Sequence, residues 1–409
     1  MSQTMPPPVF DPFAPGFTDD PYPQYAALRA DAPAGRNPLG FWLLTRYEDI
    51  SALLRANMSV EDRNIIDRDL LALREQMFGE ETQRSQARSM LDRDPPDHTR
   101  LRRLVSKAFT PRAVEALRPR ITGLVDEMLD AAQDNSQVDL VDALAFPLPF
   151  AVIGEMLGTP PADHERIRQL SGTVVRSLEP VNDPATAAAI VEADAELTQI
   201  AAEMIAWKRA HPAGDLLTAL INAEDDGDVL GEEELISQTL LLYIAGHETT
   251  VNLIAGGTLA LLRHPDQLAR LRAEPALVGN AVEEMLRYDS PVQATRRITL
   301  EPASFGDVTI PAGSFVLALL GSANRDEACF GPDAGQLRID RENARQHVSF
   351  GAGPHHCLGA SLARMEAAIA LDRLVTRFPA LALDGEPTWN GRINLRGPAH
   401  LPVSLGTAR

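Results

Sequence analysis

The chain is poor in cysteine and in positive charge, and each shortage excludes a class of protein. Only two cysteines, Cys329 and Cys357, occur among 409 residues, which excludes a disulfide framework and a four-thiolate zinc or iron–sulfur site. So few cysteines favour a reducing compartment, and we expect a cytoplasmic protein. Lys and Arg number 38 against 57 Asp and Glu, a formal net charge of −19, which argues against nucleic-acid binding.

The beginning of the chain lacks the marks of a targeting segment. The first Lys or Arg is Arg29, so the positively charged start of a secretory signal peptide is missing. Residues 1–20 are rich in proline, and we expect an extended N-terminal arm there. The length alone suggests two or three domains of about 150 residues. Because no repeat, low-complexity tract or clear linker divides the rest, we expect one domain over residues 21–409.

The hydrophobic pattern predicts a fold that is mainly α with a small β region. We expect short strands separated by turns between 290 and 320 and again at the end of the chain. Residues 57–90 show no clean period, and we expect a long mobile connection there. Helical spacing predicts helices over 25–30, 47–55, 98–158 (with a proline-bounded break near 146–149), 163–178, 185–210, 233–263, 265–289 and 358–378.

One predicted helix is almost wholly apolar over residues 235–262, where His247 and Glu248 are the only Asp, Glu, His, Lys or Arg residues. A membrane span is one interpretation, because about 20 apolar residues suffice to cross a bilayer. A carboxylate near the middle of a span is costly, so we favour a buried central helix. Glu248 precedes Thr249, and an acid beside an alcohol is suited to relay protons. A threonine within a helix can also bond the carbonyl one turn back.

The sharpest motif surrounds the second cysteine: Phe350-Gly351-Ala352-Gly353-Pro354-His355-His356-Cys357-Leu358-Gly359. Cys357 directly precedes a predicted helix, and the N-terminal end of a helix favours the thiolate form of a cysteine. An inert buried cysteine, a Cys–His nucleophile and a single thiolate ligand to heme iron all remain open. A dinucleotide-binding loop is excluded, because His356 stands where its third glycine belongs.

This segment resembles, position for position, the heme-binding loop of the cytochrome P-450 family: Phe, Gly, any residue, Gly, any residue, His or Arg, any residue, Cys, any residue, Gly. The resemblance implies heme b as cofactor, buried between the long central helix and the cysteine loop. It implies that Cys357 is the axial iron ligand, that Phe350 packs near the sulfur and that His355 binds a heme propionate. Residues 245–250 resemble the family's acid–alcohol motif, which implies that Glu248 and Thr249 deliver protons.

A glutamate and an arginine three residues apart, Glu284 and Arg287, resemble the family's structural Glu-x-x-Arg, which supports the thiolate loop. Four other pairs have the same spacing, including Glu115 and Arg118, and only the order along the chain selects this one. The family often has an Arg or His as a third member, and here Gln336 stands in its place.

Heme brings two propionate carboxylates that need cationic partners. His98 and Arg102 are four residues apart, so they share one face of a predicted helix. The resemblance adds Arg297 and His355 to this set, with Arg296 as the alternative to Arg297.

A basic stretch interrupts the acidic chain between residues 98 and 120. It contains seven Lys or Arg and one Glu, which gives a local charge of +6. The simplest interpretation is a solvated helix face. The resemblance places this helix near the heme thiolate, where a redox partner docks, which implies an acidic ferredoxin near Arg100, Arg103, Lys107 and Arg112. The chain has no flavin- or nicotinamide-binding module, so a separate NAD(P)H-dependent ferredoxin reductase supplies the electrons.

Taken together, the motifs imply a soluble bacterial-type heme-thiolate monooxygenase that hydroxylates a small, mainly hydrophobic organic molecule. We expect a monomer with no nucleic-acid or membrane partner. A heme-thiolate binding or sensing protein without turnover is the alternative, whereas a cysteine hydrolase lacks a well-placed base. The resemblance implies pocket segments at 85–91, 171–180, 242–245, 292–295 and 393–395, where Arg88 or Arg176 could bind an acidic group. The substrate itself is not encoded in these motifs.

Overall fold

The computed structural model describes residues 8–78, 89–107, 109–135, 137–159, 164–181, 183–225 and 227–406. Its helices are α1 (Tyr22–Asp31), α2 (Tyr47–Arg55), α3 (Arg68–Phe78), α5 (Asp97–Ser106), α6 (Pro111–Ala116), α7 (Arg118–Ala132), α8 (Pro147–Leu157), α9 (His164–Val174), α10 (Pro184–Ala210), α11 (Leu216–Ile221), α12 (Glu232–Arg263), α13 (Pro265–Ala273), α14 (Val278–Tyr288), α15 (Leu320–Ala323), α16 (Glu327–Phe330) and α17 (Ala360–Arg377). Short helical turns are η1 (Asp62–Asn64), η2 (Met90–Asp92), η3 (Val141–Ala145), η4 (Val175–Leu178), η5 (Pro275–Leu277), η6 (Ala344–Gln346) and η7 (Gly353–His355).

The strands are short and belong to several small sheets. They are β1 (Ala34–Arg36), β2 (Trp42–Leu44), β3 (Met58–Ser59), β4 (Gln137–Asp139), β5 (Glu224–Asp225), β6 (Asp228–Val229), β7 (Thr295–Thr299), β8 (Ala303–Phe305), β9 (Val308–Ile310), β10 (Phe315–Ala318), β11 (Ala382–Leu383), β12 (Thr388–Trp389), β13 (Pro398–His400) and β14 (Pro402–Ser404). The largest sheet has the order β1-β2-β10-β7-β3, in which β10 runs parallel to β2 and the other pairs are antiparallel. The predicted class, mainly α with a small β region, is confirmed.

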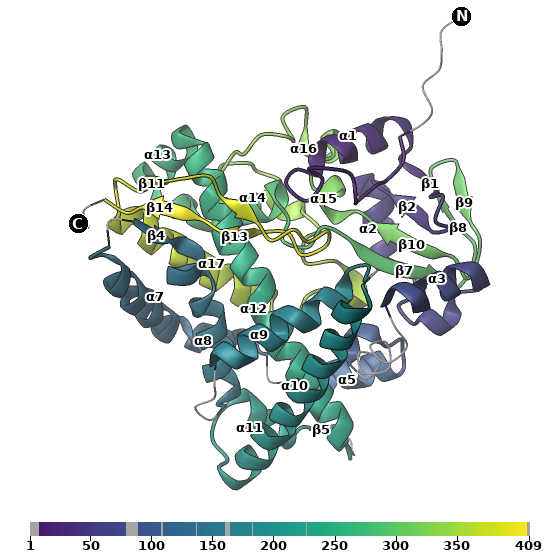
Figure 1. Ribbon diagram of the computed structural model, residues 1–409, viewed down its shortest axis with the longest axis horizontal. Helices are drawn as coiled ribbons and strands as arrows, with labels where there is room; N and C mark the ends of the chain where they lie inside the picture. The colour runs from purple at the N-terminus through teal and green to yellow at the C-terminus, as the bar shows by residue number, and fades with distance from the viewer. Residues whose placement is uncertain are drawn as a thin grey trace, which may run out of the picture.

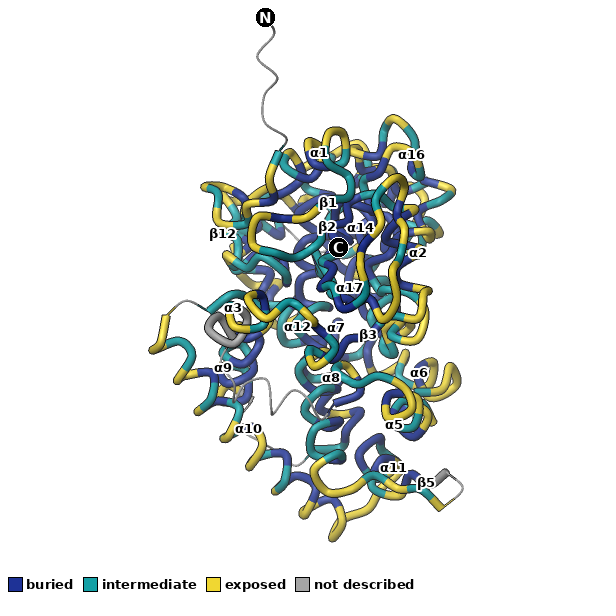
Figure 2. The backbone as a smooth tube through the Cα atoms, turned by 90° about the vertical axis from the view of Figure 1, so that its right-hand side faces the viewer, coloured by how far each residue is buried: buried dark blue, intermediate teal, exposed yellow. Residues whose placement is uncertain are grey.

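Helices occupy the larger part of the molecule, and the sheet that contains β1, β2, β10 and β7 lies at the right of the view in Figure 1. The long helix α12 runs through the helical part and packs against α8, α10, α14 and α17. It is apolar on every side because neighbours surround it, as expected for a central helix. Figure 2 shows the buried residues gathered in this interior and the exposed ones on outer helices such as α10. No helix among the described residues has the length and apolar character that crossing a bilayer requires.

Two expectations for the N-terminal third are wrong within the described residues. Residues 11–19 form turns rather than an extended arm, because Phe10 and Phe17 are buried and Phe17 packs edge-on against Tyr25. Residues 1–7 of the predicted arm lie outside the described residues. The expected connection over 57–90 contains β3 and α3, whose first turn is capped by the Asp67 carboxylate and whose Leu70 is buried.

The strand β4 interrupts the helix expected over 98–158. It pairs with β14 from the end of the chain, and such a long-range partner leaves no mark in the local periodicity. The helix expected over 265–289 is also divided, into α13 and α14, with Pro275 at the start of the short turn η5 between them. The long helices α9, α10, α12 and α17 lie within a few residues of their predicted ranges, and α2 has the predicted bounds.

Candidate functional site

The glycine-rich segment before α17 folds into a tight loop that presents Cys357. The backbone N–H of Cys357 donates to the carbonyl of Phe350 at 2.9 Å, which closes the loop. Gly353 has φ +68°, and a Cβ atom there would lie 2.3 Å from the carbonyl oxygen of Leu54. Only glycine fits such a position, both for its dihedral angle and for the close approach of α2. The loop therefore packs directly against the N-terminal part of the chain.

The side chain of Cys357 is exposed at one side, and protein atoms surround the rest of it. These surroundings raise the pKa of the thiol, whereas the backbone N–H of Gly359 and the charges of Arg102 and Arg364 lower it. The sulfur thus lies at the N-terminal end of α17, where backbone donors favour a thiolate ligand. Among the described residues no histidine ring bonds to this sulfur, which argues against a Cys–His nucleophile.

Four basic side chains from distant segments gather beside this loop: His98 and Arg102 on α5, Arg297 on β7 and His355 on η7. The rings of His98 and His355 lie 4.1 Å apart between centroids. His98 is 2% exposed, and neither of its ring nitrogens has a hydrogen-bond partner. Within the described part of the chain, Arg102 donates only to the carbonyl of His356, at 2.6 Å. The predicted set is therefore brought together in space.

None of the four side chains of this basic cluster bonds a carboxylate within the described residues, and Asp94 acts on His98 and Arg297 through its charge alone. Burial lowers the pKa of His355 to about 3, helped by the nearby charges of His98, Arg297 and Arg102. Burial, and then the charge of Arg296, lowers the pKa of Arg297 to about 10. Buried bases without acids are unfavourable unless a ligand brings negative charge. Two carboxylates would satisfy the cluster, and the propionates of heme are such a pair.

The alternative choice of Arg296 for this cluster is wrong. Its guanidinium pairs with Asp62 at 2.9 Å and with Asp92 at 3.2 Å, so its charge is already compensated. On a strand, neighbouring side chains point to opposite faces, which separates Arg296 from Arg297.

The predicted acid and alcohol lie in the middle of α12. Thr249 Oγ1 donates to the carbonyl of Ala245 at 3.2 Å, the bond one turn back that the sequence predicts. Ala245 is exposed although its helix is largely buried, so this turn of α12 faces open space as Cys357 does. Glu248 is 15% exposed and pairs with Arg392 at 2.9 Å. Arg392 was not anticipated from the sequence, because it lies 144 residues away.

A buried ion network supports the cysteine loop from the side of α14. Arg287 donates to both carboxylate oxygens of Glu284, at 2.6 and 2.8 Å, and both residues are fully buried. The third member is Arg341, which donates to Glu284 at 3.1 Å, and not Gln336. Gln336 is exposed and contributes only its backbone carbonyl to Arg287 and Arg341. An amide side chain could not replace the guanidinium, whose five donors reach several carbonyls at once.

A second acid next to Glu284 was missed by sequence reasoning. Glu283 accepts hydrogen bonds from His347 at 3.0 Å and from Arg364 at 2.9 and 3.1 Å. Burial would raise its pKa, but these bonds outweigh burial and lower the pKa to about 2. Arg364 also lies 4.5 Å above the ring of Phe350, so this group links α14 to the cysteine loop. The packing of Phe350 against the sulfur stays a prediction.

The basic stretch on α5 to α7 is less charged than its sequence suggests. Arg100 pairs with Glu234 and, at 3.3 Å, with Asp228, both more than a hundred residues away. Arg118 and Arg120 pair with acidic side chains too. Arg103, Lys107 and Arg112 are exposed, and their contact with a partner stays a prediction.

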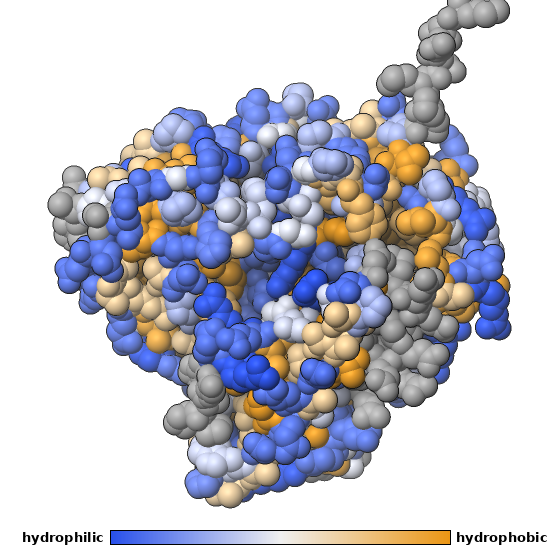
Figure 3. Space-filling view, in the orientation of Figure 1, coloured by the Kyte–Doolittle hydropathy of each residue, from blue (hydrophilic) through white to orange (hydrophobic). Residues whose placement is uncertain are grey.

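Three of the predicted pocket segments are joined by hydrogen bonds. Val292 forms a β-bridge with Leu395, and Glu179 accepts from the backbone N–H groups of Ile393 and Asn394, both at 2.7 Å. Arg176 is exposed. Residues 85–88, with Arg88, lie outside the described residues. Figure 3 shows hydrophilic and apolar side chains interspersed on one face, with the apolar ones in separate groups.

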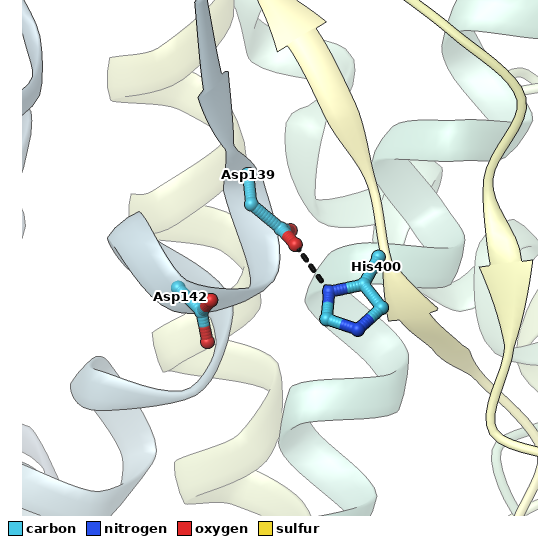
Figure 4. Close-up of side chains that lie close together, drawn as sticks. All are labelled: Asp139, Asp142 and His400. Carbon is cyan, nitrogen blue, oxygen red and sulfur yellow. Dashed lines mark hydrogen bonds and ion pairs between the residues drawn. The ribbon is translucent and has the colours of Figure 1, made fainter.

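A cluster of Asp139, Asp142 and His400 on the surface has a structural explanation (Figure 4). Asp139 accepts from His400 Nδ1 at 2.6 Å and from the backbone N–H groups of Val141 and Leu401. Its oxygens are thus used to join β4 to β13, so the cluster is no candidate metal centre.

Comparison with known proteins gives one consistent result. A sequence model described as Cytochrome P450 matches residues 185–392. Cytochrome P450 107B1 of Saccharopolyspora erythraea is 45% identical over 407 residues, which cover 96% of this chain and 97% of that protein. The vitamin D(3) 25-hydroxylase of Pseudonocardia autotrophica is 40% identical over 405 residues, 97% of this chain and 96% of the enzyme. The tirandamycin C-bound P450 monooxygenase TamI superposes with a TM-score of 0.86 and 40% identity, covering 98% of this chain and 100% of that structure.

Proposed function

The chain belongs to the cytochrome P450 family of heme b monooxygenases, and we propose that it hydroxylates a small, mainly hydrophobic organic substrate with electrons from a ferredoxin. The observation that carries the site assignment is the basic cluster of His98, Arg102, Arg297 and His355 beside a single thiol. Relatives named as monooxygenase and hydroxylase favour the enzyme over a binding or sensing protein.

In this proposal Cys357 binds the heme iron as a thiolate, and the basic cluster binds the propionates. The heme supplies dioxygen activation, in which two electrons and two protons reduce one oxygen atom to water while the other enters a C–H bond as hydroxyl. The protein provides a buried, preorganised setting: the N-terminal end of α17 stabilises the thiolate, and the Glu283 and Glu284 networks hold the loop.

Glu248 and Thr249 hold and pass protons in this proposal. The Thr249 hydroxyl hydrogen is directed to the carbonyl of Ala245, which leaves the Oγ1 lone pairs to accept from a water molecule. The Glu248 carboxylate is only 15% exposed, so it can take up a proton without opening the site to bulk water.

The cofactor assignment has a direct spectroscopic test. Reduced, heme-loaded protein under carbon monoxide should show the far-red-shifted Soret band of a thiolate-ligated heme. Cys357→His should keep heme but lose that band, while Cys329→Ser should leave it in place. If the Cys357→His protein kept the band, the ligand assignment would be wrong.

The electron donor is proposed from the exposed cations Arg103, Lys107 and Arg112 on an otherwise acidic molecule. Reversing the charge of all three to Glu should slow ferredoxin-driven reduction and flatten its dependence on salt. Dithionite needs no docking and should reduce both proteins equally. An unchanged ferredoxin rate and salt dependence would contradict this partner.

The substrate class is proposed from buried apolar residues in the predicted pocket segments, including Leu242, Val174 and Leu395. Similar proteins include a vitamin D(3) 25-hydroxylase and a monooxygenase with bound tirandamycin C, and both support an organic ligand. Hydrophobic compounds that displace water from the iron should shift the Soret band of the ferric protein, and product analysis with oxygen-18 gas then identifies hydroxylation. Preferential shifts by small charged compounds would overturn the proposal. The scarcity of cysteine supports a location in the reducing cytoplasm, and we propose that the protein is a monomer.

A further inference from the structure

The carboxylate of Glu248 is held by one cation, and that cation comes from the far end of the chain. Arg392 Nη1 donates to Glu248 Oε2 at 2.9 Å, and the two side chains are 19% and 15% exposed. Arg392 Nη2 also reaches the carbonyl of Gly172 on α9, at 3.4 Å. One guanidinium therefore connects the central helix, α9 and the C-terminal loop.

The buried neighbour His247 does not compensate the charge of Glu248. Its Nδ1 bonds the carbonyl of Tyr243 at 2.8 Å, and because a carbonyl only accepts, Nδ1 carries the hydrogen. Nε2 then presents a lone pair toward Ser171 Oγ at 3.3 Å and lies 3.8 Å from Glu248 Oε1. Burial lowers the pKa of His247, so the ring is neutral and Arg392 is the counter-ion of the acid.

The loop that carries Arg392 is fixed from two sides. A turn closes it, in which Asn390 N–H donates to the carbonyl of Gly397 at 3.0 Å. On one side Gln293 N–H donates to the carbonyl of Asn394 at 2.8 Å. On the other side each carboxylate oxygen of Glu179 accepts one backbone N–H of this loop. The position of Arg392, and through it of Glu248, thus depends on segments that belong to the predicted substrate pocket.

We propose that Arg392 is a positioning residue for proton delivery, which fixes the Glu248 carboxylate and makes its placement depend on the packing of residues 172–179 and 390–397. The inference rests on the proposed role of Glu248 as a proton carrier. A carboxylate released from its partner rotates freely, and small displacements of a proton donor are costly in rate. Substrate in the pocket presses on the segments that hold Arg392, which couples occupancy to proton delivery.

The test compares R392Q, R392K, E248Q and the double variant R392Q/E248Q in heme-loaded protein. We expect R392Q to lower the share of NADH electrons recovered in product by roughly tenfold, with the remainder in hydrogen peroxide, and to raise the solvent deuterium isotope effect. R392K keeps the charge and should restore part of the coupling. The double variant should be no worse than E248Q, because Arg392 acts through Glu248.

Two measurements separate this role from simple destabilisation. The carbon monoxide band and heme content of R392Q should equal those of the unaltered protein, and R166Q, which removes the exposed Arg166–Glu196 pair between α9 and α10, should leave coupling unchanged. E179Q should raise hydrogen exchange of residues 391–395 and lower coupling, because an amide offers one acceptor where two N–H groups donate.

The outcomes are distinct. If E248Q itself leaves coupling unchanged, the proposed function of Glu248 fails. If E248Q is impaired but R392Q is not, or if the two losses add in the double variant, the role of Arg392 is overturned. A loss in R392Q that Lys does not restore, together with lost heme, identifies a structural role only and also overturns it.

Discussion

Two groups of charged residues flank the cysteine loop, and they differ in whether the polypeptide itself supplies bonded partners of opposite charge. In the supporting network on α14, Glu284 pairs with Arg287 and Arg341, and Glu283 pairs with Arg364 and accepts a hydrogen bond from the neutral ring of His347, so each buried carboxylate has a bonded cation. In the basic cluster, His98 and Arg297 are buried, Arg102 and His355 are partly exposed, and none of the four bonds an acid among the described residues. The network is complete in the polypeptide alone, whereas the proposed propionates would supply the acids that bond the cluster. Buried charge without a partner therefore identifies the ligand site better than buried charge itself.

The largest expected effect comes from breaking the matched network. Arg287→Ala leaves the buried Glu284 with one partner fewer, and we expect heme-free protein to lose about 3–5 kcal/mol of unfolding free energy. Urea unfolding followed by circular dichroism measures the loss. A change below about 1 kcal/mol would show that the network is not a support, since that is the range of exposed ion pairs.

The second-largest expected effect is a loss of unfolding free energy in acid, which weakens the same network. The pKa of Glu283 is lowered to about 2 in the fold from its usual 4.5, so its contribution is fully present above pH 4.5 and is lost as pH falls toward 2. The shift corresponds to at most roughly 3 kcal/mol. Unfolding free energies measured across this range should decline, and Glu283→Gln should flatten the decline at the cost of lower stability at neutral pH. An equally steep decline in the variant would assign it to other groups.

Removing a cation from the basic cluster should not lower the stability of the heme-free protein, in contrast to the loss expected for Arg287→Ala. Arg297→Gln removes an unmatched buried cation, so heme-free protein should be as stable as before or more stable. Heme should dissociate roughly 10 to 100 times faster, because a charged hydrogen bond contributes about 1.5–3 kcal/mol. Transfer of heme to apomyoglobin measures the rate. Arg296→Gln is the matched control and should leave heme release unchanged, since Arg296 pairs with Asp62 and Asp92.

The smallest expected effect comes from an exposed ion pair, and it tests whether the three-residue spacing alone stabilises the protein. Glu115 and Arg118 have the same three-residue separation as Glu284 and Arg287, but both are exposed. Arg118→Ala should leave the urea midpoint and heme content unchanged within error. A loss comparable to that of Arg287→Ala would mean that burial is not what distinguishes the two pairs.

The sequence predicts those parts of the site that are local in the chain. The loop around Cys357 and the long helix with Glu248 are contiguous motifs, and periodicity suffices to place α12. Arg341 and Arg392 were missed because each acts on an acid far away in sequence, and nothing local marks such a pair. The same reason explains the basic stretch, whose charge is reduced by acids more than a hundred residues distant.

The basic cluster draws its members from residues near 98, near 297 and near 355. At a synthesis rate of about 5–20 residues per second, roughly 10 to 40 s separate the emergence of His98 and Arg297 from the ribosome. During that interval the N-terminal third lacks the partners that complete it, and α2 lacks Gly353 for longer still. With the proposed propionate-binding residues, heme capture would therefore be a late event in the synthesis of each chain, and the positions of these residues in the sequence would set its timing.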